Sequence, residues 1–139
     1  MLSMVESRSN GQITFFEDTD IDEVSLQKHG QSFGMCPQYN AIWDQMTVEE
    51  SLNLMALIKG LSPSDKKHNI DLICDMMDLD PFRKTIAGNL SGGNKRKLSC
   101  ALTLVVCPKL EFLDEPTAGV DPVSRRALFK MIKQLSQSG

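Results

Sequence analysis

The apolar residues of this chain recur every three or four positions in four separate stretches, and this spacing predicts amphipathic helices. The first two stretches follow one another closely, so they predict a small helical subdomain. Their methionine-rich faces are typical of a packed core rather than of a cofactor site. The four expected buried stripes are Val48, Leu52, Met55 and Ala56; Ile70, Ile73, Cys74 and Met77; Leu98, Ala101, Leu102 and Val105; and Leu128, Met131, Ile132 and Leu135.

Polar residues, glycine and proline mark where these helices begin and end. Thr47 and Glu50 have the spacing of a capping box, in which each side chain bonds the other residue's backbone N–H. Gly60 stands where the first helix is expected to stop, and Pro63 suits the first position of the second. The third helix is expected to run from Ser91 to about Val106.

Three short stretches between or before the helices predict strands: Gly11–Glu17, Ser32–Pro37 and Leu110–Leu113. The polar segment Asp18–Gln31 is expected to be a loop with a helical turn. Strands that alternate with helices indicate an α/β domain.

Composition excludes several functions. The net charge of −3 and a pI near 5.3 give no electrostatic reason to bind nucleic acid, and the few aromatic residues are too scattered to stack bases.

The longest apolar run, Ala101–Cys107, is far shorter than the roughly 20 residues that span a bilayer, and Met1–Asn10 does not resemble a signal peptide. The cysteines form no CxxC pair, so we expect reduced thiols rather than zinc or disulfides; they are Cys36, Cys74, Cys100 and Cys107.

The segment Leu90–Lys95 reads Leu-Ser-Gly-Gly-Asn-Lys and is the first candidate for chemistry. Two glycines at a helix start let a phosphate approach the backbone, and the positive end of the helix dipole favours an anion. Ser91 adds a hydroxyl that could cap the helix or donate to a phosphate oxygen. Alone, such a segment is more often just a turn.

The second candidate is the pair of carboxylates that ends the predicted strand Leu110–Leu113. Asp114 could orient Mg²⁺ or its waters, and Glu115 could polarise an attacking water in phosphoryl transfer. Seen alone, the pair would usually be a solvated acidic turn.

The two segments in this order resemble the ATP-binding-cassette family, with its LSGGQ signature, Walker B strand and D-loop. Leu90–Arg126 carries most of the likeness, and Cys36–Asn40 followed by Thr47–Glu50 resembles the Q-loop and the start of the helical subdomain. The residues of both segments, including Lys95–Ser99, are most similar to those of the lipid-exporting A subfamily. The resemblance covers roughly residues 11 to 139.

The family's site residues match this chain as follows. Gln38 matches the Q-loop glutamine, which senses Mg²⁺ and the attacking water, and Glu115 matches the catalytic glutamate. Asp114 matches the Walker B aspartate that serves the metal. The expected nucleotide contacts, made to ATP on an opposite domain, are Ser91, Gly92, Gly93, Asn94 and Asp121. Asp121 matches the D-loop aspartate, which crosses the interface between the two domains, and it could at the same time be the N-cap before Pro122.

The resemblance implies an α/β fold: an incomplete P-loop NTPase (ABC ATPase) core with an inserted α-helical subdomain. Residues 1–139 would form one partial nucleotide-binding domain. Its parts would be core strands and Q-loop (11–38), helical subdomain (44–90), and signature helix, Walker B strand, D-loop and following helix (91–139).

The chain departs from the family pattern in four places. No Gly-x-x-x-x-Gly-Lys-Ser/Thr loop occurs; in the family it would precede Gly11–Glu17. The switch histidine would follow Gly139. Asn94 replaces the usual glutamine and keeps its amide. Glu111 interrupts a normally apolar strand, where a carboxylate needs a partner or a raised pKa. It could mark relaxed constraint or a strand shorter than supposed.

The expected function is therefore a fragment of the ATP-binding and ATP-hydrolysing domain of a transporter that moves a substrate, expected to be lipid, across a membrane. Such a fragment would not hydrolyse ATP alone. ATP and Mg²⁺ would be its cofactors in the complete domain, and a second nucleotide-binding domain and transmembrane domains its partners, at the cytosolic face of a membrane. The alternative is a non-catalytic module that presents its signature face to an intact domain. The acidic balance disfavours the related ATPases that act on ribosomes or DNA.

Overall fold

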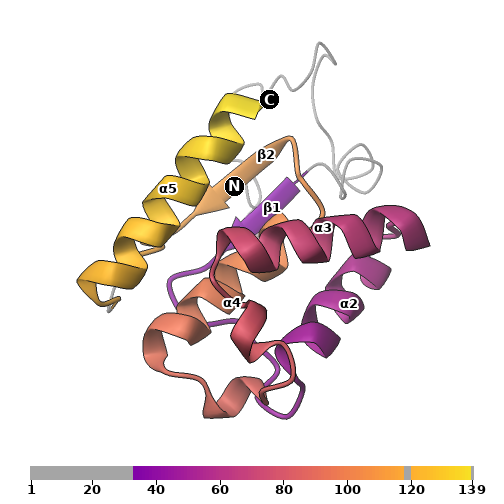
Figure 1. Cartoon of the computed structure of the whole chain (residues 1–139). Coiled ribbons are helices and arrows are strands. Elements are labelled where there is room, and N and C mark those ends of the chain that lie inside the picture. The colour runs from indigo at the N-terminus through magenta and orange to yellow at the C-terminus, as the bar shows by residue number, and fades with distance from the viewer. Residues whose placement is uncertain (1–32, 118–119, 139) are drawn as a thin grey trace, which may run out of the picture.

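The computed structural model describes residues 33–117 and 120–138. Four helices and two strands make up most of this part, and two short 3₁₀ helices join α3 to α4 (Figure 1). In chain order the elements are β1 (Phe33–Cys36), α2 (Val48–Ile58), α3 (Pro63–Met76), η1 (Asp80–Phe82), η2 (Ala87–Asn89), α4 (Gly92–Leu104), β2 (Leu110–Leu113) and α5 (Pro122–Ser138).

The two strands form a parallel pair. Phe33 lies opposite Leu110 and Cys36 opposite Leu113, and the N–H of Asp114 donates to the carbonyl of Cys36 at 2.9 Å, which carries the pairing one residue further. Both strands lie where the sequence predicts them. The predicted strand Gly11–Glu17 and the loop Asp18–Gln31 lie outside the described residues.

Helix α4 lies at the centre of the described part. It contacts β1 and α5 on one side and α2 and α3 on the other, and Figure 1 shows it between the two groups. The consecutive residues from Arg96 to Leu102 in this helix are all buried, which requires neighbours all round the helix. The predicted inward stripe of α4 is confirmed, since Leu98, Ala101, Leu102 and Val105 are all buried. The helix ends at Leu104, slightly before the predicted end.

The helical subdomain has the local features that the sequence predicts. Its α3 stripe is buried as expected, while on α2 Met55 is only half-buried. Gly60 has a φ of 75°, the left-handed conformation that ends a helix, and α2 stops two residues before it. On α5, Leu128 and Met131 are buried and Ile132 is half-buried; the side chain of Leu135 lies outside the description.

The capping box of α2 is present. The hydroxyl of Thr47 accepts from the N–H of Glu50 at 3.2 Å, and the Glu50 carboxylate accepts from the N–H of Thr47 at 2.8 Å. Replacing Thr47 with alanine removes one half of the box, so we expect about 1 kcal/mol of destabilisation in urea unfolding. Thr47→Ser keeps the hydroxyl and is the control. Equal unfolding midpoints for the two variants would show that the box contributes nothing.

Candidate functional site

The signature segment forms the N-terminus of α4. Ser91 is the N-cap, with extended backbone (φ −60°, ψ 157°), and its hydroxyl accepts from the N–H of Asn94 at 3.3 Å. Ser91 and Gly92 are exposed, and the side chain of Asn94 is half-buried. The N–H groups of a helix's first turn have no partner within the helix, so this end keeps backbone donors that face outward.

The two signature glycines lie in different surroundings. A Cβ built on Gly92 would meet no atom within 4 Å, so a ligand can reach this stretch of backbone. A Cβ on Gly93 would lie 2.8 Å from Oδ2 of Asp121 and 3.0 Å from Oγ of Ser124. Gly93 is therefore explained by the close approach of α5, whereas no packing of the described residues requires glycine at Gly92.

Asp121 is the N-cap of α5. Its Oδ1 accepts from the N–H groups of Val123 and Ser124, both at 3.0 Å. The hydrogen bond from Ser124 holds the pKa of Asp121 below its usual value, so the carboxylate stays charged at neutral pH. The predicted role of Asp121 as an N-cap is confirmed. Its second carboxylate oxygen, Oδ2, lies close to Gly93 of the signature segment.

The predicted carboxylates stand at the carboxyl end of β2. Asp114 and Glu115 are both exposed. Glu115 has a φ of 44°, a left-handed conformation that a non-glycine residue adopts at a cost and that is common at functional turns. Its Oε2 accepts from Nε2 of Gln38 at 2.9 Å, although 77 positions separate the two residues. The structure thus brings together the two residues that the sequence analysis names as catalytic.

The donor set at this end of the sheet suits Mg²⁺ bound together with phosphates. Asp114, Glu115 and the amide of Gln38 offer hard oxygen atoms, which are the ligands that Mg²⁺ prefers. In the part of the chain that the structure describes, no group of three or more His, Cys, Asp or Glu could enclose a metal ion. That is compatible with Mg²⁺, which is usually held by one or two carboxylates, waters and the substrate's phosphates.

Glu111 is part of β2, so the idea of a shorter strand is wrong. Its carboxylate occupies the space that a side chain on Gly34, its partner across the strand pair, would fill. Neither carboxylate oxygen has a hydrogen-bond partner among the described residues, and burial raises the pKa of Glu111 to about 7. The nearby hydroxyl of Thr103, which donates to the carbonyl of Cys100 at 2.9 Å, and the positive charge of Lys59 lower this pKa and offset only part of the rise.

One residue that organises this site is not among those that the sequence pattern singles out. Arg96 is only 2% exposed. Its guanidinium donates to the carbonyl of Pro37, which precedes Gln38, and to the carbonyl of Glu115. The available signal was its place in a helix whose residues after Lys97 are apolar or small. A basic residue there has to find acceptors, because a buried charge without partners is strongly unfavourable.

The comparisons with known proteins decide the family. A family model described as "ABC transporter" matches residues 1–118. This chain belongs to the ABC transporter family. Curated relatives place it in the A subfamily, as a segment of an ABC nucleotide-binding domain. The resemblance stated from the motifs is confirmed.

Two of those relatives show how much of a transporter the chain represents. It is 38% identical over 139 residues to "ATP-binding cassette sub-family A member 2" of Homo sapiens, covering 100% of this chain and 6% of that protein. It is 36% identical over 133 residues to "ABC transporter A family member 11" of Arabidopsis thaliana, covering 96% of this chain and 14% of that protein. The chain therefore spans a small part of the ABC proteins that it matches.

Solved structures confirm the fold class. "Structure of cbiO1 from clostridium perfringens: Part of the ABC transporter complex cbiONQ" superposes with a TM-score of 0.80 at 23% identity, over 96% of this chain and 54% of that one. A second structure, described as the ATP-binding subunit of an ABC transporter, gives a TM-score of 0.73 at 22% identity, over 88% of this chain and 54% of that one. The described part is thus an incomplete ABC ATPase core. Within it, no helix is long and apolar enough to cross a bilayer.

Proposed function

We propose that this chain is part of the ATP-binding and ATP-hydrolysing domain of an ABC transporter that moves lipid across a membrane. The observation that carries this proposal is the contact between Gln38 and Glu115, 2.9 Å long, at the end of β2. It supplies a carboxylate that can polarise a water molecule and an amide that can orient it, next to the candidate metal residue Asp114. Lipid is proposed as the substrate because the motifs of the chain resemble those of the lipid-exporting A subfamily.

The main site residues predicted from the sequence have the following roles in this proposal. Mg²⁺, held by Asp114 and Gln38, would neutralise charge that develops on the phosphates. Glu115 accepts a proton from the attacking water. The backbone at Gly92, with Ser91, binds phosphates of ATP on an opposite nucleotide-binding domain, because the space around it is open. Asp121 lies beside this segment and faces the same partner domain.

The 139 residues alone are proposed not to hydrolyse ATP. Their sequence contains no Gly-x-x-x-x-Gly-Lys-Ser/Thr loop, the element that cradles the β- and γ-phosphates in P-loop enzymes. ATP turnover by this chain that Glu115→Gln abolishes would contradict this point.

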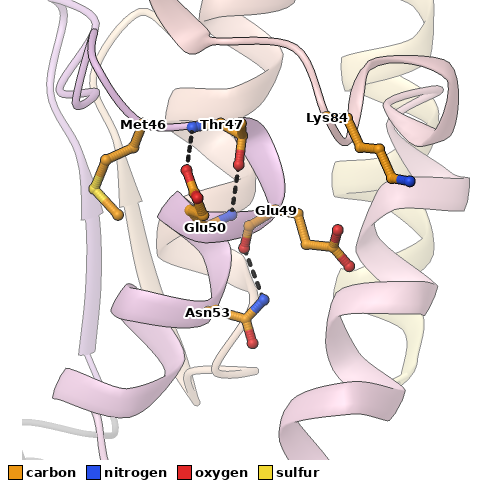
Figure 2. Close-up of a pocket in the computed structure, with 6 residues that line it drawn as sticks. All are labelled: Met46, Thr47, Glu49, Glu50, Asn53 and Lys84. Carbon is orange, nitrogen blue, oxygen red and sulfur yellow. Dashed lines mark hydrogen bonds between the residues drawn. The ribbon is translucent and has the colours of Figure 1, made fainter.

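A shallow depression on the helical subdomain is the proposed contact with the transmembrane domains. It has a volume of about 540 Å³, and Figure 2 shows its lining residues: Met46, Thr47, Glu49, Glu50, Asn53 and Lys84. The exposed aromatic residues Tyr39 and Trp43 lie on the chain between Gln38 and this depression. A cytosolic loop of a membrane domain seated here would contact the segment that follows Gln38 in the sequence, and would hold the chain at the cytosolic face of the membrane.

The partner domain can be tested by association. We expect the chain to bind an intact A-subfamily nucleotide-binding domain in the presence of Mg-ATP, and to bind at least about tenfold more weakly when Ser91 is replaced by arginine, because the large side chain blocks the phosphate approach. Sedimentation velocity with and without Mg-ATP measures both.

The control is Ser62→Arg. Ser62 caps α3 as Ser91 caps α4, accepting from the N–H of Asp65 at 3.2 Å, so both variants lose an equivalent cap. Only the variant at Ser91 should weaken ATP-dependent association. Equal weakening by the two, or association that does not depend on Mg-ATP, would contradict the proposed role of the signature segment.

The second candidate is the non-catalytic module, favoured by the open backbone at Gly92. This candidate predicts the same Mg-ATP-dependent association, but ATP turnover would not depend on the Gln38–Glu115 pair. Glu115→Gln in a complete transporter containing this segment separates the two: loss of ATP turnover supports the catalytic proposal, and unchanged turnover supports the module.

A further inference from the structure

Arg96 makes an unusual number of contacts with the loops that carry the catalytic pair. Its Nη2 donates to the carbonyls of Asp114 and Glu115 at 2.9 and 3.0 Å, and its Nε donates to the carbonyl of Pro116 at 2.9 Å. Its Nη1 donates to the three consecutive carbonyls of residues 37–39, at 2.6, 3.1 and 3.4 Å. One side chain of α4 therefore holds the turn after β2 and the segment after β1.

These contacts satisfy the guanidinium group fully. It has five N–H donors, and six carbonyls accept from them, so one hydrogen is shared between two acceptors. In the part of the chain that the structure describes, no carboxylate forms a salt bridge with Arg96, which is 2% exposed. A buried charge whose partners are only backbone carbonyls fixes the positions of those backbones.

The two loops matter because each carries one half of the catalytic pair. Arg96 binds the carbonyls of Gln38 and Glu115 themselves, while their side chains meet at 2.9 Å. Glu115 is also the residue in the left-handed conformation, which persists only where surrounding contacts determine it.

We propose that Arg96 is a positioning residue: it sets the distance between Gln38 and Glu115 and links that distance to the signature helix. That Gln38 and Glu115 act in catalysis rests on the proposed function. That Arg96 fixes the two loops does not depend on ATP. A shift of α4, which carries Ser91 and Gly92 at its start, would be transmitted to both loops through one side chain. A lysine could not replace it, because its three donors on a flexible stem cannot span six carbonyls in two loops.

The test is amide hydrogen exchange on the 139-residue chain without nucleotide. Two N–H groups report on the loops: that of Ala41, which donates to Oγ of Ser99 at 3.3 Å, and that of Asp114, which donates to the carbonyl of Cys36. In Arg96→Met we expect both to exchange at least about tenfold faster, while the amide of Met77, the C-cap of α3, changes little. The pattern separates a local positioning role from general loss of stability.

Two further variants keep the test decisive. Lys97→Met removes a charge from the adjacent position, where Nζ of Lys97 lies 3.4 Å from Oδ2 of Asp78, and should leave the loop amides unchanged. Arg96→Lys keeps the charge in case the methionine variant does not fold, and should give intermediate exchange at Ala41 and Asp114. Unchanged loop exchange in the Arg96 variants, or an equal rise throughout the chain, would overturn the proposal.

A spectroscopic readout addresses the catalytic pair directly. In a chain that keeps Arg96, Glu115→Ala should shift the side-chain amide NMR signals of Gln38, because it removes their acceptor. In the Arg96→Lys background the same change should have a clearly smaller effect. An effect of the same size in both backgrounds would overturn the proposal, whatever the association experiment with Mg-ATP shows.

Discussion

Replacing Glu111 with leucine is expected to stabilise the chain at about pH 8 and to flatten the pH dependence of its stability. The pKa of this carboxyl is about 7 in the folded chain, against an ordinary value of 4.5. The folded state therefore binds a proton more tightly than the unfolded state does. Between these two values the folded chain is still protonated while the unfolded chain is not, so stability falls as the pH rises.

The size of the effect follows from the difference between the two pKa values. The stabilising proton is fully present below pH 4.5 and is lost once the pH exceeds about 7, with a difference on the order of 3 kcal/mol. Leucine has a similar volume and no charge to desolvate, so the variant should gain most of that amount above pH 7. It would also fill the space over Gly34 that the carboxylate occupies now.

Urea unfolding at several pH values between about 4 and 8 measures this prediction. Glu111→Gln is the control, since it removes the charge but leaves a buried amide that needs partners. It should flatten the pH dependence as leucine does while gaining less stability. A variant with leucine that still loses stability steeply between pH 4.5 and 7 would show that another group is responsible.

The parts of this fold that sequence predicts are those decided by neighbours along the chain. A cap needs only the residue and the N–H three positions later, and both Thr47 and Ser91 form such contacts. The inward stripes of α3 and α4 follow from helical periodicity and a large apolar core, and they are buried as expected. The strand Leu110–Leu113 is found with the same bounds.

The parts that sequence does not predict depend on contacts between distant segments. The place of Glu111 over Gly34 follows from the register of two strands that lie 77 positions apart, and a register cannot be read from either strand alone. The same holds for Arg96, whose acceptors are backbone carbonyls that carry no side-chain signal. Periodicity alone gives no reason to single it out from its basic neighbours.

The candidate site was predicted by motif rather than by geometry, and the structure adds distinctions that the motif does not make. The resemblance treats Gly92 and Gly93 alike, but only Gly93 lies against Asp121. It names Gln38 and Glu115 as catalytic without a contact between them, and the folded chain places them in hydrogen-bond contact. Their roles toward ATP and Mg²⁺ stay predictions.

The second large effect is expected from Leu98→Ala. Leu98 is fully buried in α4, the helix that contacts β1, α5, α2 and α3. Removing its side chain leaves a cavity that neighbours on several sides can only partly fill, so we expect about 2–5 kcal/mol of destabilisation. The matched control is Leu57→Ala, the same substitution at a position in α2 that is 67% exposed, which should change stability by less than about 0.5 kcal/mol.

The probes used for Leu98→Ala also test whether the described part unfolds as one unit. Trp43 is the single tryptophan of the chain and lies between β1 and α2, so its fluorescence reports on that junction, while far-UV circular dichroism reports on all the helices. Because α4 packs against both β1 and the helical subdomain, the two signals should report the same unfolding midpoint as each other within each variant. Separate transitions in the unsubstituted chain, or a loss for Leu98→Ala no larger than for Leu57→Ala, would mean that α4 does not join the two halves.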